Sequence, residues 1–250
     1  TFAFPKEPHI RRNHYSLPSL TDETRVIGIR SSALRPEGMK ILNPALQADL
    51  DAGKPVKLNL GGGLRPLHGH YLLDLVDLPG VDVQADLNEP LDLLPTGSVE
   101  AVHCRHLLEH IDNLLPLLEE LHRVVRPGGE IDIRVPHFSN PYGYSDPTHV
   151  RFFGLYSFFY FADDQDQPRR KVPAFYSQCR FRVNQIHIRL MHANWFDKVV
   201  RSMLQPLINL SSGWQDWYER RLCRLFPANE IQYRITPADK VQEKAARLAA

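Results

Sequence analysis

The chain has 250 residues, with 30 Lys or Arg against 29 Asp or Glu, so its formal net charge is +1 with all 12 His neutral. That balance argues against a nucleic-acid partner and against an acidic tail. The longest apolar run, residues 152–162, is too short for the roughly 20 residues of a membrane span. Three widely spaced cysteines fit neither a disulfide framework nor a zinc site. We therefore expect a soluble, cytoplasmic protein with reduced thiols.

The chain divides into an N-terminal extension, residues 1–55, and a main domain, residues 56–250. The extension is rich in Pro, Arg and His, and its prolines break any long periodic pattern, which predicts short helices. In the main domain short apolar strands alternate with helical patterns. Strands are predicted at 57–60, 71–75, 81–86, 98–103, 130–135, 181–190 and 230–236, and helices at 107–126 and across 195–226. This alternation indicates an α/β fold with a doubly wound, mostly parallel sheet.

A run of three glycines, Gly61-Gly62-Gly63, follows the first predicted strand of the main domain. Such a turn lets a ligand approach main-chain amides at the carboxyl edge of the sheet. The dinucleotide fingerprint would need glycine where this chain has Pro66, and the Gly-Lys-Ser/Thr of a phosphate-binding loop is absent. Later strands end at Asp74 and Asp86, which could accept hydrogen bonds from a ribose and from an adenine amino group. The alternative for the glycines is a plain tight turn.

At this point the sequence resembles class I S-adenosylmethionine-dependent methyltransferases. The resemblance lies in LNLGGG, YLLDL, ADLNEPL, HLLEHI and LHRVVRPGGEIDIRVP, within about residues 56–162. It implies a Rossmann-like sheet of seven strands and S-adenosylmethionine as cofactor. It also implies that Gly61 and Gly63 line the methionine part, Asp74 the ribose and Asp86 the adenine.

The chain departs from the family pattern in three places near the glycines. Asn59 stands where the family usually has an acid, and Arg65 where it has a further glycine. Arg65 could pair with the cofactor carboxylate. Only residues 64–70 separate the glycine turn from the second strand, whereas a helical crossover takes a dozen or more residues. We therefore expect the first crossover helix to be vestigial.

The segment His106-Leu-Leu-Glu109-His110 spells the inverted zinc-protease motif, in which two histidines share one helix face. A zinc hydrolase is therefore an alternative function, although no third ligand is evident on that helix or its successor. In the methyltransferase resemblance the same segment lines the cofactor pocket. We assign His106 to the wall of the cofactor site and assign no metal; a solvated or hydrogen-bonded histidine is the other interpretation.

An insert or lid, residues 137–180, leaves the sheet at the edge where ligands bind. Methyl transfer to a hydroxyl needs a group that removes a proton, and His149 oriented by Asp146 is our first candidate, with His137 second. Together the three could instead hold a divalent ion that lowers the pKa of the acceptor. In the structural alternative, Asp146 caps a turn and His149 merely packs.

The insert also resembles a branch of these methyltransferases associated with bacterial polysaccharide and glycoconjugate synthesis, through His-Phe-Ser, Asp-Pro-Thr-His and a Phe-Phe pair. This implies O-methylation of a sugar, nucleotide sugar or glycan, and association with other glycan-synthesis domains. Residues 152, 153, 156, 159 and 160 are aromatic at helical spacing, which predicts a helix packed on the sheet. The rival to an enzyme is a non-catalytic scaffold with the same fold.

Overall fold

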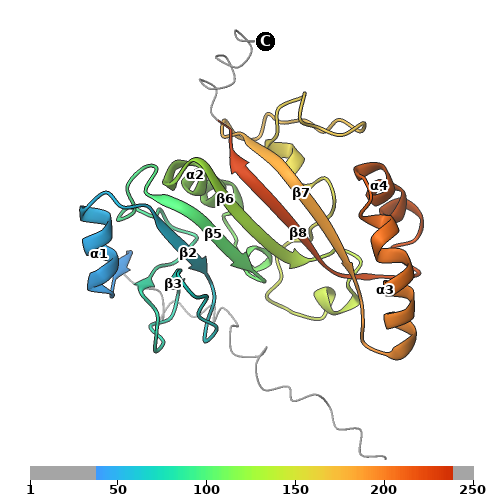
Figure 1. The fold of residues 1–250 in the computed structure, drawn as a ribbon, viewed down its shortest axis with the longest axis horizontal. Coiled ribbons are helices and arrows are strands. Elements are labelled where there is room, and N and C mark those ends of the chain that lie inside the picture. Colours follow the sequence, from blue (N-terminus) through green and yellow to red (C-terminus); the bar gives the residue numbers. More distant parts are fainter. Residues whose placement is uncertain (1–37, 239–250) are drawn as a thin grey trace, which may run out of the picture.

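The computed structural model describes residues 38–238, which form one eight-stranded sheet with helices around it (Figure 1). The order of strands across the sheet is β1-β4-β3-β2-β5-β6-β8-β7. The pairs β4-β3, β3-β2, β2-β5 and β5-β6 are parallel, and the pairs at both ends are antiparallel. The strands are β1 (Lys40–Ile41), β2 (Val56–Leu60), β3 (Tyr71–Asp74), β4 (Val83–Gln84), β5 (Val99–Arg105), β6 (Val125–Pro136), β7 (Phe181–Leu190) and β8 (Ala228–Pro237).

Within residues 38–238, four α-helices and three short 3-10 helices connect the strands. They are α1 (Pro44–Asp51), η2 (Leu108–His110), α2 (Leu114–Val124), η3 (Pro141–Tyr144), η4 (Ser157–Phe161), α3 (Trp195–Ile208) and α4 (Ser212–Arg221). In Figure 1, α1 lies beside the β3 end of the sheet, and α3 and α4 lie beside the opposite end, next to β7. No helix among residues 38–238 is both long and apolar enough to cross a membrane.

The mostly parallel α/β sheet predicted from the sequence is confirmed, with one strand more than the seven expected. The additional strand is β1, which pairs antiparallel with β4 at the edge of the sheet. It belongs to the predicted N-terminal extension, of which residues 1–37 lie outside the described part of the chain. Residues 61–70 form turns and no helix, as expected for a vestigial first crossover.

The core forms on both faces of the central strands. Leu72 and Leu73, successive residues of β3 whose side chains point to opposite faces, are both buried, as expected for parallel strands covered on both faces. Helix α2 presents an apolar stripe to this core at three- and four-residue spacing, formed by Leu117, Leu118, Leu121 and Val124.

The long helix predicted over residues 107–126 is wrong at both ends. His106 has a φ of +51°, and its N–H donates to the carbonyl of Arg134 at 2.8 Å, so the chain continues along β6 before it turns. The next residues form only η2, and α2 starts at Leu114. At the other end, the expected stop Pro127-Gly128-Gly129 lies inside β6, which already starts at Val125.

The aromatic helix predicted over residues 152–160 is also wrong in form, because the chain makes only the short η4 there. Phe153, Phe158 and Phe159 are buried, whereas Phe152 is 48% exposed. Phe152 stacks instead on Tyr144, with ring centroids 4.4 Å apart. Part of this aromatic run therefore faces solvent within the insert.

Candidate active site

The glycine turn after β2 needs glycine for steric and conformational reasons. Gly61 and Gly63 have φ of +60° and +56°, in the left-handed region that favours glycine. A Cβ at Gly61 would lie 2.7 Å from a methyl carbon of Leu107, and one at Gly62 would collide with the amide of Asn59. The turn is therefore a cradle of bare backbone, which fits the close approach of a ligand.

Asn59, which stands where the family pattern has an acid, bridges the glycine turn with a hydrogen bond. Its side chain is buried, and its Nδ2 donates to the carbonyl oxygen of Arg65 at 3.2 Å. The amide of Arg65 donates to the carbonyl of Gly62 at 2.9 Å. Arg65 itself is exposed, so its guanidinium is accessible to an anionic group of a ligand. Asn59 thus holds the loop in shape.

The two acids assigned to cofactor binding are both buried at strand ends, and Asp74 is bonded to the glycine turn. Asp74, the last residue of β3, accepts from the amide of Gly63 at 3.0 Å and from that of Val76 at 3.3 Å. Asp86 follows β4, and its Oδ1 accepts from both nitrogens of Asn88 at 2.9 Å. A carboxylate oxygen has two lone pairs, so Asp74 can shape the turn and still accept from a ribose hydroxyl.

The turn after β5 packs against the glycines on one side. Leu107 contacts Gly61, and His106 points toward β8, where its Nε2 lies 3.2 Å from Glu230 Oε2. Its Nδ1 lies 3.5 Å from Glu109 Oε1. Burial alone would lower the pKa of His106, but the bonds to Glu109 and Glu230 outweigh it and raise the pKa to about 9. His106 is therefore a cation at neutral pH.

This geometry contradicts the zinc-protease interpretation of His106, Glu109 and His110. The motif needs two histidines one turn apart on an α-helix, but the positive φ of His106 and the short η2 separate them. His110 instead meets the insert, with its ring centroid 4.8 Å from that of His149. A group of potential ligand atoms does form, but from Glu109, His110 and His149.

The insert holds His149 by its backbone and not by Asp146. His149 Nδ1 donates to the carbonyl of Gly143 at 2.8 Å, while Nε2 lies 3.7 Å from Asp146 Oδ2, too far for a hydrogen bond. Asp146 caps its turn, accepting from the amide and the hydroxyl of Thr148. The expected carboxylate-oriented imidazole is therefore replaced by a carbonyl-oriented one. The Nε2 of His149 keeps its lone pair.

His110 is fixed in the same way, which sequence reasoning missed. The Thr148 hydroxyl donates to Asp146 at 2.6 Å, so its oxygen accepts from His110 Nδ1 at 2.8 Å. Burial lowers the pKa of His110 and keeps the ring neutral. The backbone amide of Val150 donates to the carbonyl of Glu109 at 2.8 Å and holds the insert on this turn. In the sequence, the only sign of these contacts with the insert is the pair Glu109-His110 in the segment 106–110.

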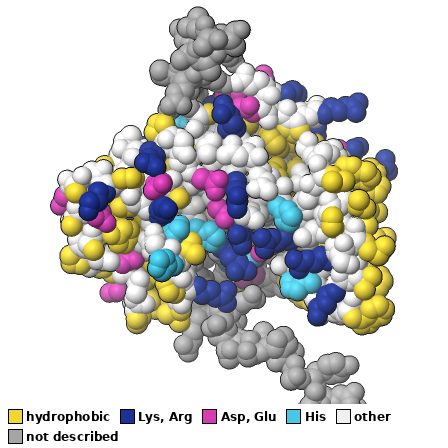
Figure 2. All heavy atoms as spheres, viewed as in Figure 1, with side chains coloured by type: hydrophobic (Ala, Val, Ile, Leu, Met, Phe, Trp, Pro, Cys, Tyr) yellow, Lys and Arg dark blue, Asp and Glu magenta, His cyan; other side chains and the backbone are white. Residues whose placement is uncertain are grey.

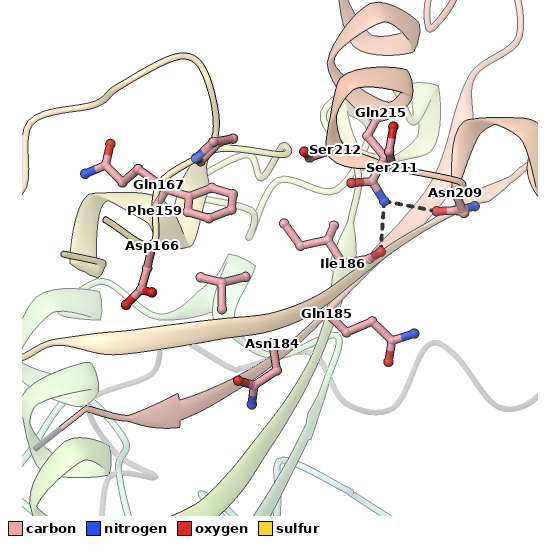
Figure 3. Close-up of a pocket in the computed structure, with 12 residues that line it drawn as sticks. Phe159, Asp166, Gln167, Asn184, Gln185, Ile186, Asn209, Ser211, Ser212 and Gln215 are labelled. Atoms are coloured by element: carbon pink, nitrogen blue, oxygen red, sulfur yellow. Dashed lines mark hydrogen bonds between the residues drawn. The ribbon is translucent and has the colours of Figure 1, made fainter. Parts of the chain in front are cut away.

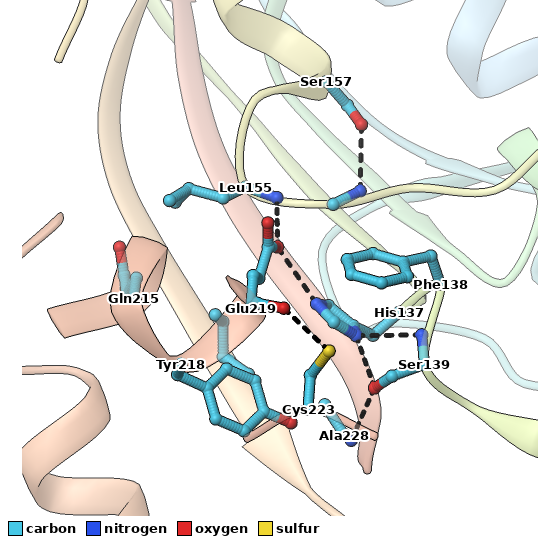
Figure 4. Close-up of polar contacts among 12 residues, drawn as sticks. His137, Phe138, Ser139, Leu155, Ser157, Gln215, Tyr218, Glu219, Cys223 and Ala228 are labelled. Atoms are coloured by element: carbon cyan, nitrogen blue, oxygen red, sulfur yellow. Dashed lines mark hydrogen bonds and ion pairs between the residues drawn. The ribbon is translucent and has the colours of Figure 1, made fainter. Parts of the chain in front are cut away.

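His137, the second candidate base, is part of a buried polar network (Figure 4). Its Nε2 donates to Glu219 Oε1 at 3.0 Å, and its Nδ1 lies 2.8 Å from Ser139 Oγ. Glu219 also accepts from the amide of Leu155, and Ser139 Oγ accepts from that of Ala228 at 2.9 Å. Both ring nitrogens are occupied and the side chain is fully buried. His137 therefore ties α4 to the end of β6 and cannot reach an acceptor.

Basic groups rim the carboxyl edge of the sheet. Figure 2 shows Lys, Arg and His side chains gathered in the lower middle of the face, where the parallel strands of Figure 1 end. Arg189 lies 3.1 Å and Arg105 4.0 Å from Glu230. Burial would raise the pKa of Glu230, but the bond from His106 and the two arginines lower it to about 2. The edge suits a ligand that carries negative charge.

A separate polar pocket of about 310 Å³ lies at the far edge of the sheet, between η4, β7 and α4 (Figure 3). Gln215 donates there to the carbonyl of Ile186 at 2.8 Å and to Asn209 Oδ1 at 3.2 Å. Strand β7 is four positions away from β2 in the sheet. The pocket is therefore distinct from the glycine turn and its acids.

Part of the chain matches a known protein family. Residues 73–133 match the model of a family described as a methyltransferase domain. Similar solved structures include a SAM-dependent methyltransferase from Archaeoglobus fulgidus (18% identity, 78% of this chain and 94% of that chain, TM-score 0.42). Another is the YcgJ protein from Bacillus subtilis (14% identity, 79% and 99%, TM-score 0.42). No curated protein has significant similarity to the sequence.

The cofactor of such a domain fits the residues present. Its methionine part would lie against the bare backbone of Gly61 and Gly63, its ribose at Asp74 and its adenine at Asp86. Side chains would fill this cradle at Gly61 and Gly62, and Asp74 is already joined to the turn. The family match thus covers residues 73–133 of the chain, and the residues around the glycine turn fit S-adenosylmethionine, the cofactor that a methyltransferase domain implies.

Proposed function

We propose that this protein is an O-methyltransferase that methylates a hydroxyl of a sugar, nucleotide sugar or glycan. One observation carries the proposal. The turn after β5 packs against Gly61 through Leu107 and, two residues later, holds the insert through Glu109. The insert that carries His149 is therefore attached to the same turn that packs on the cradle assigned to the cofactor.

In this proposal each residue has a distinct task. Gly61 and Gly63 line the methionine part of the cofactor, Asp74 and Asp86 hold its ribose and adenine, and His106 forms part of the wall. Bound S-adenosylmethionine supplies an electrophilic methyl group on a sulfonium. A hydroxyl is a weak nucleophile until it loses its proton, so a group must activate it. We assign this activation to His149, and Asp146 holds the turn on which His149 lies.

The chemistry around His149 supports a sugar as acceptor. Tyr142 and Tyr144 flank Gly143, whose carbonyl orients His149, and both rings are more than 60% exposed. Exposed aromatic faces pack against the apolar faces of ligand rings. The basic rim at Arg105 and Arg189 suits the phosphates of a nucleotide sugar or an acidic glycan.

Two further parts of the proposal concern organisation and location. We assign residues 1–55 as an extension to the methyltransferase domain 56–250, and the insert 137–180 as the lid of the acceptor site. Within the insert, the amide of Val150 donates to the carbonyl of Glu109 in η2, and Arg151 donates to the carbonyl of Ile111, which follows η2. The three cysteines are buried and unpaired, which supports a reducing, cytoplasmic location.

The test has two stages. Isothermal titration of S-adenosylmethionine should show binding that Asp86→Ala weakens and that Asp92→Ala, a change of an exposed acid, leaves intact. Loss of a buried acceptor should cost about 1 to 3 kcal/mol of binding free energy. Labelled methyl transfer to a panel of sugars, nucleotide sugars and amines should then favour hydroxyl acceptors. Transfer only to amines would refute O-methylation, and failure of folded protein to bind the cofactor would favour a scaffold.

A further inference from the structure

Three potential metal ligands from two segments meet beside the proposed acceptor site. They are a carboxylate oxygen of Glu109 and a ring nitrogen each of His110 and His149, all within 4.8 Å of one another. We propose that these residues bind one divalent transition-metal ion. The site differs from the zinc motif considered as an alternative at His106, Glu109 and His110, and it departs from our assignment of no metal.

In both histidines a hydrogen bond from Nδ1 orients the ring and leaves Nε2 as the nitrogen for an ion. The Nδ1–H of His149 is donated to the carbonyl of Gly143, and that of His110 to the hydroxyl of Thr148. In the neutral form of each ring, the lone pair that an ion would bind is then on Nε2. Histidine ligands in metal sites almost always donate their other ring N–H to an oxygen, which fixes the tautomer and the ring orientation. This structure shows that outer arrangement at both rings.

Glu109 provides a second, independent observation. Its side chain is 2% exposed, and neither carboxylate oxygen has a hydrogen-bond donor among residues 38–238. Oε1 has only the ion-pair contact with His106 at 3.5 Å. Buried carboxylates are normally paired, hydrogen-bonded or bound to a metal. Glu109 thus has an ion pair with His106 but no hydrogen bond, and an ion between Glu109 and the two histidines would bind the lone pairs that remain.

The types of ligand atom, two imidazole nitrogens and one carboxylate oxygen, indicate which ions the site would bind. Imidazole ligands suit zinc, iron, cobalt and related ions, whereas magnesium and calcium sites are built mainly of oxygen. Two histidines and one carboxylate occur in catalytic zinc sites that leave a position for water or substrate. Bonds of about 2.1 Å at tetrahedral angles place ligand atoms about 3.4 Å apart. The three side chains therefore need to draw together by about an ångström when the ion binds.

The catalytic consequence rests on the proposed function. An acceptor hydroxyl at the open position of the ion has a lowered pKa and loses its proton to solvent. Its oxygen then forms the new bond to the methyl carbon as the bond from that carbon to sulfur breaks. The lone pair of His149 serves the ion in this scheme, so His149 activates the hydroxyl as a ligand.

The test is titration of the metal-stripped full-length protein with Co²⁺, whose visible absorption reports ligand number and geometry. We expect one Co²⁺ per chain, displaced by Zn²⁺. His149→Ala and Glu109→Gln should weaken binding at least about 100-fold, because even outer-shell changes cost 10- to 100-fold. Thr148→Val removes the oxygen that orients His110 and should weaken it within that range. His192→Ala, a change of an exposed histidine, should have no effect.

Circular dichroism of each variant shows whether it is folded, and Zn²⁺ should raise the melting temperature of the wild type but not of His149→Ala. Equal Co²⁺ affinity for the wild type, His149→Ala and Glu109→Gln would overturn the site. Methyl transfer that persists undiminished in the metal-stripped protein would overturn its catalytic role and leave the proposed function standing. Metal binding without transfer to any acceptor would retain the site and refute the function.

Discussion

Gly61→Ala is the substitution for which the structure gives the most detailed expectation. Left-handed backbone costs a residue with a Cβ about 1 to 2 kcal/mol, and Gly61 has a φ of +60°. The new Cβ would also lie 2.7 Å from Leu107 Cδ1 and 3.2 Å from its Cγ. Leu107 must therefore move, and overpacking of this kind costs about 1 to 3 kcal/mol. We expect a total loss of about 2 to 5 kcal/mol in the free energy of unfolding.

Two matched variants separate the contributions. Gly69→Ala has the same backbone problem, with a φ of +75°, but its Cβ would meet nothing within 4 Å. It should lose only the conformational part, about 1 to 2 kcal/mol. In a double-mutant cycle, Leu107→Ala should remove most of the steric part of the Gly61→Ala cost. Urea unfolding of the wild type, the three single variants and the double variant measures these losses. Equal losses for Gly61→Ala and Gly69→Ala would refute the packing of Leu107 on the glycine turn.

Three other changes test the remaining contacts. Asp74→Ala leaves the amide of Gly63 without its buried acceptor and should cost about 1 to 3 kcal/mol of unfolding free energy; an unchanged urea midpoint would contradict this. Glu230, with its pKa lowered from 4.5 to about 2, stabilises the fold above pH 4.5 by on the order of 3 kcal/mol, and this is lost as pH falls toward 2. Unfolding measured against pH should show a flatter acid limb in Glu230→Gln, and an identical limb would exclude the pairing. Glu219→Ala leaves His137 buried without its acceptor and should lower stability by about 1 to 3 kcal/mol without changing cofactor affinity; a loss confined to cofactor binding would contradict its structural role.

The central strands were predictable because their signals are local. Apolar runs that end at Gly61, Asp74 and Asp86 mark buried parallel strands, and the structure places strand ends next to each. The two-residue β1 carries no such pattern, since so short an edge strand is defined only by its pairing with β4. The helix predicted from Leu107 failed because the chain there follows β6 through a backbone hydrogen bond, which no periodicity encodes.

The candidate site likewise has one part that could be predicted from the sequence and one part that could not. The residues that we assign to the cofactor follow strand ends and are close in sequence to their own partners, as Asp74 is to Gly63. The partner of His149 was predicted to be its neighbour Asp146, but its Nδ1 bonds Gly143 and its ring meets His110, 39 residues earlier. His137 likewise bonds Glu219, 82 residues later. Contacts at such separations depend on the tertiary fold and leave no spacing rule in a single sequence.

The way the insert is attached bears on how the acceptor range of this protein can evolve. The segment is pinned before its tip by His137 and after it by Val150, and the carbonyl of Gly143 holds His149 through the main chain. The side chains of Tyr142 and Tyr144 take no part in orienting His149 among the described residues. Point mutations at these two positions would therefore change the opening of the proposed acceptor site without changing the hydrogen bond that orients His149.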